Sequence, residues 1–114
     1  MTAARAFLRP AMRRPNCRVV TGALVTRVLI EEGRAVGVEY LKDGQRHVLR
    51  AKAEVILSGG AINSPQLLQL SGLGPAGLLQ TFGIPVVRDM PAVGADMQDH
   101  FSARLHFRCT EPIT

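Results

Sequence analysis

Apolar and polar side chains alternate through the first half of the chain, and this pattern predicts β-structure. Leu24–Glu31 alternates, and Ala35–Leu41 and Arg46–Ala51 follow with the period of two that is typical of strands. Glu32-Gly33 and Asp43-Gly44 separate these stretches, and Asp-Gly is a strong hairpin signal. We therefore expect an antiparallel meander that has one face toward water.

A different pattern follows the meander. Val55-Ile56-Leu57 is apolar without alternation, as in a strand that is buried on both faces. It runs into the pair Gly59-Gly60, after which Asn63 or Ser64 can cap a helix that ends at Ser71-Gly72. A strand, a glycine turn and a helix in this order indicate an α/β fold.

Weaker signals fill the rest of the chain, and no repeat or linker divides it. The expected helices are Thr2–Arg14, which Pro10 ends or kinks, and Pro75–Thr81, which Gly83 stops. The expected strands and extended pieces are Arg18–Thr21, Ile84–Val87 and Ala103–Cys109, with irregular chain over Met90–His100.

Composition and charge narrow the classes of function. The chain has 114 residues, a net charge of +5 and five arginines in its first 18 positions. Such a cluster can bind nucleic acid or anionic lipid, but the chain has no Trp and one Tyr, which argues against base stacking. We expect a solvated helix face, no nucleic-acid partner and no metal site, since the two cysteines form no CxxC pair. No apolar run is long enough to span a bilayer, so we expect no transmembrane segment and a cytoplasmic location.

The glycine turn after Leu57 is the main candidate for chemistry. It is neither a Walker A loop, because no Lys follows the glycines, nor a GxGxxG fingerprint. Paired glycines allow the backbone to approach a ligand closely, and they also allow tight packing. The residues alone leave both interpretations open.

The stretch Gly60–Gly74 resembles the second signature of the glucose-methanol-choline (GMC) flavoprotein oxidoreductases at every fixed position. Val19–Val25, Arg34–Tyr40, Ile84–Val87 and Val93–His100 also resemble segments of that family, so the likeness covers nearly the whole chain. It is greatest to the bacterial choline dehydrogenase branch. Two departures are Gly59 where the family more often has Ala, and Asp96-Met97 where it has Asn-Leu.

The resemblance implies FAD as cofactor and oxidation of a small primary alcohol to the aldehyde, with choline favoured. It implies that residues 1–114 are an internal part of an FAD/NAD(P)-binding, Rossmann-like domain that includes the meander and short helices. The family's GxGxxG turn and catalytic histidine lie outside this chain, so no residue here is expected to be catalytic and the chain alone is expected to be inactive. The residues expected to contact FAD are Val25, Gly59, Gly60 and Ala61, with Asp99 and His100 as further candidates.

Two alternatives remain beside this hypothesis. The chain is either a small non-catalytic domain that binds an acidic partner through its N-terminal arginines, or a truncated remnant without activity. Association of the parent enzyme with a membrane is the alternative to a cytoplasmic location. The histidines do not favour catalysis: His47 is expected to be exposed, His106 packed, and His100 structural or adjacent to the cofactor.

Overall fold

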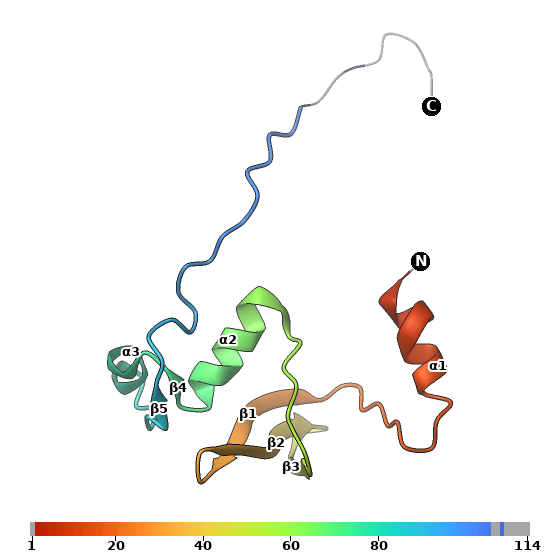
Figure 1. Cartoon of the computed structure of the whole chain (residues 1–114), viewed down its shortest axis with the longest axis horizontal. Coiled ribbons are helices and arrows are strands. Elements are labelled where there is room, and N and C mark those ends of the chain that lie inside the picture. The colour runs from red at the N-terminus through yellow and green to blue at the C-terminus, as the bar shows by residue number, and fades with distance from the viewer. Residues whose placement is uncertain (1, 106–107, 109–114) are drawn as a thin grey trace.

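A computed structural model describes residues 2–105 and 108, with a three-stranded antiparallel sheet and a smaller helical unit beside it (Figure 1). The helical segments are η1 (Ala4–Leu8), α1 (Arg9–Ala11), α2 (Gly60–Leu70) and α3 (Ala76–Thr81), and the strands are β1 (Leu24–Glu31), β2 (Arg34–Lys42), β3 (Gln45–Arg50), β4 (Leu73–Gly74) and β5 (Arg88–Asp89). The two units meet where α2 lies against β1.

The predicted meander is confirmed, with strand order β1-β2-β3. Both hairpins have two-residue turns in which each residue adopts a positive φ, at 50° and 76° for Glu32 and Gly33 and at 51° and 75° for Asp43 and Gly44. This left-handed pair matches the twist of the flanking strands. Local turn chemistry therefore sets the register of the sheet.

Strand β1 carries an irregularity at Thr26. Val25 pairs with Tyr40 and Arg27 pairs with Glu39, so Thr26 has no partner opposite it and forms a bulge. A bulge bends the strand and re-aims the side chains on either side. The first residues of β1 thus take a different direction from the rest of the strand.

Helix α2 begins earlier than predicted. Asn63 and Ser64 were expected to cap it, but both lie inside the helix, which starts at Gly60 with a φ of 90°. The hydroxyl of Ser64 instead accepts a hydrogen bond of 3.0 Å from the N–H of Gly59. The left-handed glycine makes the turn that the sequence assigned to a capping side chain.

The unit after α2 is a small parallel β–α–β arrangement, in which β4 pairs with β5 and α3 lies between them in sequence. Its centre is Leu79, which is 1% exposed. The carboxylate of Asp89 accepts a hydrogen bond of 2.9 Å from the N–H of Ala76 at the start of α3. The predicted short helix and its stop at Gly83, with a φ of 65°, are confirmed.

Two strand predictions are wrong. Arg18–Thr21 has no strand structure and is exposed. Val55–Leu57 is not paired with another strand, and Ile56 is 76% exposed. Strands need backbone partners beside them, and the described part of the chain supplies none to either segment.

The two ends agree in part with expectation. The N-terminal helix forms, but Arg9 donates its N–H to Ala4 O in a π-helical bond just before Pro10, and the helix ends at Ala11. Residues 90–100 are irregular as predicted. Ala103–Leu105 has no strand structure, while His106, Phe107 and Cys109 lie outside the described residues.

Very little of the chain is buried. Among the described residues, Val28 and Leu79 are the buried apolar side chains. The radius of gyration is 19.9 Å, and Figure 1 shows α1 standing apart from the sheet. A compact domain of this length has a radius of about 13 Å. Fixed polar contacts and tight turns, rather than a core, therefore determine how the elements sit together.

Replacing Gly72 by Ala should open the unit around α3. A Cβ at Gly72, where φ is 83°, would lie 2.5 Å from Pro85 O and 2.8 Å from Val87 Cγ2. We expect the free energy of local opening to fall by roughly 2–4 kcal/mol, the combined cost of left-handed strain and overpacking. Amide hydrogen exchange of residues 73–89 measures this loss.

The matched control is Gly77→Ala, because Gly77 lies in α3 with open space around its Cα. This change should leave protection equal or slightly higher, since Ala favours helix over Gly. Equal loss of protection in the two variants would contradict the steric argument.

Candidate ligand groove and its polar joints

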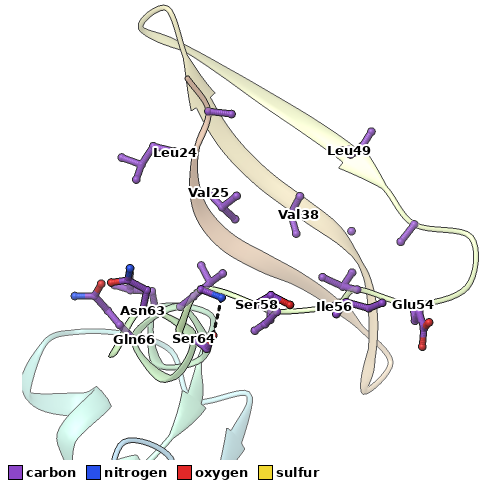
Figure 2. Close-up of a pocket in the computed structure, with 18 of the residues that line it drawn as sticks. Leu24, Val25, Val38, Leu49, Glu54, Ile56, Ser58, Asn63, Ser64 and Gln66 are labelled. Atoms are coloured by element: carbon purple, nitrogen blue, oxygen red, sulfur yellow. Dashed lines mark hydrogen bonds between the residues drawn. The ribbon is translucent and has the colours of Figure 1, made fainter. Parts of the chain in front are cut away.

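A groove lies between the meander and the segment that leads into α2. Its volume is about 790 Å³, within the range of roughly 300–1,000 Å³ that is usual for small-molecule sites. Figure 2 shows Val25 and Val38 on the sheet side, with Ser58, Ser64 and α2 on the opposite side. The groove thus has an aliphatic sheet wall and a wall made by a glycine turn.

Polar groups stand at the rim of this groove. Arg50, the last residue of β3, and Glu54 are among the lining residues, and Asn63, Ser64 and Gln66 come from α2 (Figure 2). All but Ser64 are exposed. An apolar wall with a few polar groups at its edge suits a ligand with one flat apolar part and several hydrogen-bonding atoms.

The turn before α2 has no side chain at Gly59 or Gly60, so its main chain is accessible. Gly60 has a φ of 90°, a conformation that side chains with a Cβ rarely adopt. A Cβ on Gly59 would lie 3.2 Å from the Cβ of Asn63. The turn is thus tight enough to require at least one glycine, and it presents main chain to the groove.

The structure brings together two of the six residues expected to contact a cofactor. Val25 and Gly59 line the same groove, from β1 and from the turn before α2. Ala61 lines a second groove of about 450 Å³ beside α2, and Gly60 lines neither. Asp99 and His100 are exposed beyond the second groove, where Asp99 Oδ1 accepts a hydrogen bond of 2.7 Å from the N–H of His100.

Gln69 fixes the loop that forms the far wall of the second groove. Its Nε2 donates to Val93 O at 2.9 Å. A Cβ on Gly94, where φ is 82°, would lie 2.6 Å from the same nitrogen. The loop therefore sits directly on α2, and Ala95 and Met97 follow from this anchor into the groove wall.

Ser71 joins α2 to the sheet, a role that the sequence did not indicate. Its hydroxyl donates to Leu67 O at 2.6 Å and accepts from the N–H of Val28 at 2.7 Å. Sequence reasoning treated Ser71-Gly72 only as the end of a helix. A serine directly before a left-handed glycine was the available signal, but its contact with β1 is long-range.

Glu39 is the second residue that sequence reasoning missed. Its carboxylate is bound by the hydroxyl of Thr26 at 2.8 Å, by Arg27 Nη2 at 2.9 Å and by Arg46 Nη1 at 3.0 Å. The hydrogen bond from Thr26, followed by the two guanidinium groups, lowers the pKa of Glu39 although burial opposes this. The cluster ties the bulge of β1 to β2 and β3.

His47 is half-buried rather than exposed, which corrects the prediction. Its ring stacks on Tyr40 with centroids 5.1 Å apart and planes at 20°. The two residues are directly opposite each other on β2 and β3. The stack explains the burial and supplies no sign of acid–base chemistry; His106 lies outside the described residues.

Within residues 2–105 and 108, no helix has both the length and the apolar character to cross a bilayer. Over the same part of the chain, His, Cys, Asp and Glu side chains nowhere gather in a group that could hold a metal ion.

The chain belongs to the GMC oxidoreductase family, whose sequence model matches residues 1–102. It is 57% identical over 109 residues to the mitochondrial choline dehydrogenase of Mus musculus, covering 96% of this chain and 18% of that protein. It is 52% identical over 113 residues to an oxygen-dependent choline dehydrogenase of Pseudomonas putida, covering 97% of this chain and 20% of that protein.

A solved structure supports the same assignment. The FAD-dependent oxidoreductase from Chaetomium thermophilum matches with a TM-score of 0.73 and 34% identity, over 77% of this chain and 16% of that one. The expectation of an α/β, Rossmann-like FAD-domain section with an antiparallel meander is thereby confirmed. The chain spans about a fifth of the length of the curated relatives that it matches.

Acidification should weaken the meander through Glu39. Because its pKa is lowered in the fold, ionised Glu39 stabilises the sheet above the ordinary carboxyl pKa, and this contribution is lost as the pH falls through the lowered value. NMR titration of the carboxyl and thermal unfolding from about pH 7 to about pH 3 measure it. We expect Glu39→Gln to flatten the pH dependence.

Glu54→Gln is the matched control, because Glu54 is exposed at the groove rim and lies outside the Thr26 and arginine cluster. It should leave the acid response of the meander in place. An unchanged pH profile in Glu39→Gln would contradict the assignment.

Proposed function

We propose that this chain is a section of an FAD-dependent GMC oxidoreductase that oxidises a primary alcohol, with choline as the substrate. The observation that carries the cofactor assignment is the meeting of Val25 and Gly59 across one groove. The substrate assignment follows from 52–57% identity to proteins named choline dehydrogenase. Choline is also a small alcohol, in keeping with a family of alcohol-oxidising enzymes.

The residues of the groove fit part of a flavin dinucleotide. The aliphatic wall at Val25 and Val38 suits a flat ring, and the bare main chain at Gly59 permits close approach of a polar group. Ala61, Gly60, Asp99 and His100 are further proposed contacts, which the rest of the enzyme would have to bring toward the same cofactor. When bound, FAD supplies the acceptor for the two electrons of the alcohol.

The role of this chain is that of a wall and not of a complete site. We assign residues 1–114 to the interior of the FAD-binding domain, with the pyrophosphate-binding GxGxxG turn and the catalytic histidine elsewhere in the enzyme. The relatives, of which the match covers 18–20%, leave room for both. A cytoplasmic location, with membrane association of the whole enzyme as the alternative, stays a prediction.

A chimera tests the cofactor role. Residues 1–102 replace the matching segment of the Pseudomonas putida relative, to which the chain is 52% identical. We expect the purified chimera to hold FAD near one-to-one, as read from visible absorbance. Gly60→Val in the chimera should weaken FAD binding about tenfold or more, because a β-branched residue strains a left-handed turn.

Gly77→Ala in the same chimera is the control, since a methyl there meets open space. It should retain FAD like the unmodified chimera. A chimera that folds, as judged by circular dichroism and gel filtration, but holds no FAD would contradict the proposal.

The isolated chain should neither hold FAD tightly nor oxidise choline, because its groove is open and has walls on the sheet and helix sides only. Absorbance and activity assays of the purified 114-residue chain measure this. Flavin that co-purifies near one-to-one with the chain would overturn the expectation.

The substrate is tested in the complete enzyme that carries this sequence. Choline is compared with 3,3-dimethylbutan-1-ol, which has the same shape without the charge. We expect kcat/KM to favour choline by about tenfold or more, the effect of about 1.4 kcal/mol of differential binding. Equal values would reject choline as the specific substrate and retain the alcohol class.

A further inference from the structure

We propose that Ser71 is a positioning residue for the ligand groove. Its hydroxyl fixes β1 against the C-terminal end of α2, and this sets the distance between the groove wall at Val25 and the glycine wall at Gly59. The inference rests on the proposed cofactor role of that groove. Ser71 touches no groove surface itself and acts through the two elements that it joins.

The hydroxyl of Ser71 uses its donor and an acceptor site at the same time. It donates to Leu67 O at 2.6 Å, one helical turn back, and accepts from the N–H of Val28 at 2.7 Å. Both Ser71 and Val28 are buried, at 8% and 5% exposure. A buried N–H without a partner is costly, so this contact is strongly favoured.

Val28 depends on this bond because β1 is an edge strand. The sheet order is β1-β2-β3, so β1 pairs with a strand on one side only. On its other side, the hydroxyl of Ser71 takes the place of a strand carbonyl as the acceptor for Val28. The joint thus also covers part of a sheet edge that would otherwise be open.

Val28 and Val25 lie on the same strand, on either side of the bulge, so their positions are related. Val25 precedes the bulge at Thr26, and Val28 follows it. The hydroxyl of Thr26 is held 2.8 Å from Glu39 Oε1, so the bulge itself is fixed to β2. Val25 and Val28 are thus both held to β2, and a shift of α2 relative to Val28 is also a shift relative to Val25.

Helix α2 also positions the opposite wall of the groove, at Gly59. Gly59 directly precedes α2, and Ser71 directly follows it. A helix is rigid over this length, so an error at the Ser71 end appears at the Gly59 end. The hydroxyl of Ser71 bonds directly to β1 at Val28, so it helps to set the spacing between α2 and the sheet.

Thr81 supplies a matched comparison for a purely local role. Its hydroxyl also bonds back to the carbonyl of its own helix, at the end of α3, where it donates to Leu78 O three residues earlier at 2.7 Å. It is exposed, and its hydroxyl bonds within its own helix, whereas that of Ser71 also reaches β1. If Ser71 only completed a helix end, removing either hydroxyl would have the same effect.

The test uses the chimera with the Pseudomonas putida relative, carrying Ser71→Ala, Ser71→Thr or Thr81→Ala. FAD affinity is measured by titrating the apoprotein and following flavin fluorescence, and choline kinetics are measured at saturating FAD. We expect Ser71→Ala to weaken FAD binding about tenfold, as one lost buried hydrogen bond would. The KM for choline at saturating FAD should stay unchanged, and hydrogen exchange of the peptide containing Val28 should rise.

The controls separate the possible failures. Ser71→Thr keeps the hydroxyl and should restore FAD affinity to within about threefold, and Thr81→Ala should leave it unchanged. Equal FAD affinity in Ser71→Ala and Thr81→Ala, with the unmodified chimera binding FAD, would overturn the role of Ser71 and leave the proposed function standing. An unmodified chimera without FAD would overturn the proposed function, and with it this inference.

Discussion

The hydrogen bond between the N–H of Val28 and the hydroxyl of Ser71 is the contact on which the arrangement depends. It is short, at 2.7 Å, and both residues are buried. Helix α2 meets the sheet there, and α2 in turn carries the glycine turn at one end and the loop anchored by Gln69 along its side. Because few apolar side chains are buried, this hydrogen bond between defined atoms is a larger share of what holds α2 to the sheet than it would be in a compact domain.

The stretch that resembles a GMC signature has a structural reason at several of its fixed positions. The hydroxyl of Ser64 accepts a hydrogen bond from the N–H of Gly59 and so closes the turn. Gly72 permits the close passage of Pro85, and a Cβ on Gly74 would lie 2.9 Å from the Cγ of Gln69. These positions join α2 to the turn before it, to the sheet and to the loop after α3. The signature thus joins several segments of the chain, and under the proposed function its glycine turn would let a cofactor approach the main chain closely.

The features that the sequence predicted correctly are those that depend on residues close together in the chain. The Asp43-Gly44 turn follows from two left-handed residues, and the stop of α3 follows from Gly83, so the meander and the short helix were predictable. The absence of a strand at Val55–Leu57 was not predictable, because pairing depends on neighbours that are distant in sequence. The Glu39 cluster and the bond of Ser71 were missed for the same reason, since strand register and helix placement create them. For the site, spacing left the glycine turn ambiguous, and only the family resemblance placed Val25 beside it.

Several large apolar side chains of this chain are exposed, and this bears on how a ligand could be bound. Ile56 is 76% exposed and Phe7 75%, and under the proposed function the rest of the enzyme would cover such side chains. A groove with two walls leaves much of a ligand in contact with water. The ligand then makes few contacts with the protein, so its binding is weak. Adding the remaining walls would bury these apolar side chains and the ligand in the same step, so folding and cofactor binding would stabilise each other. Under the proposed function, affinity for FAD would belong to the assembled domain, and this chain would contribute one side of the site, where Ser71 and Glu39 hold the elements together.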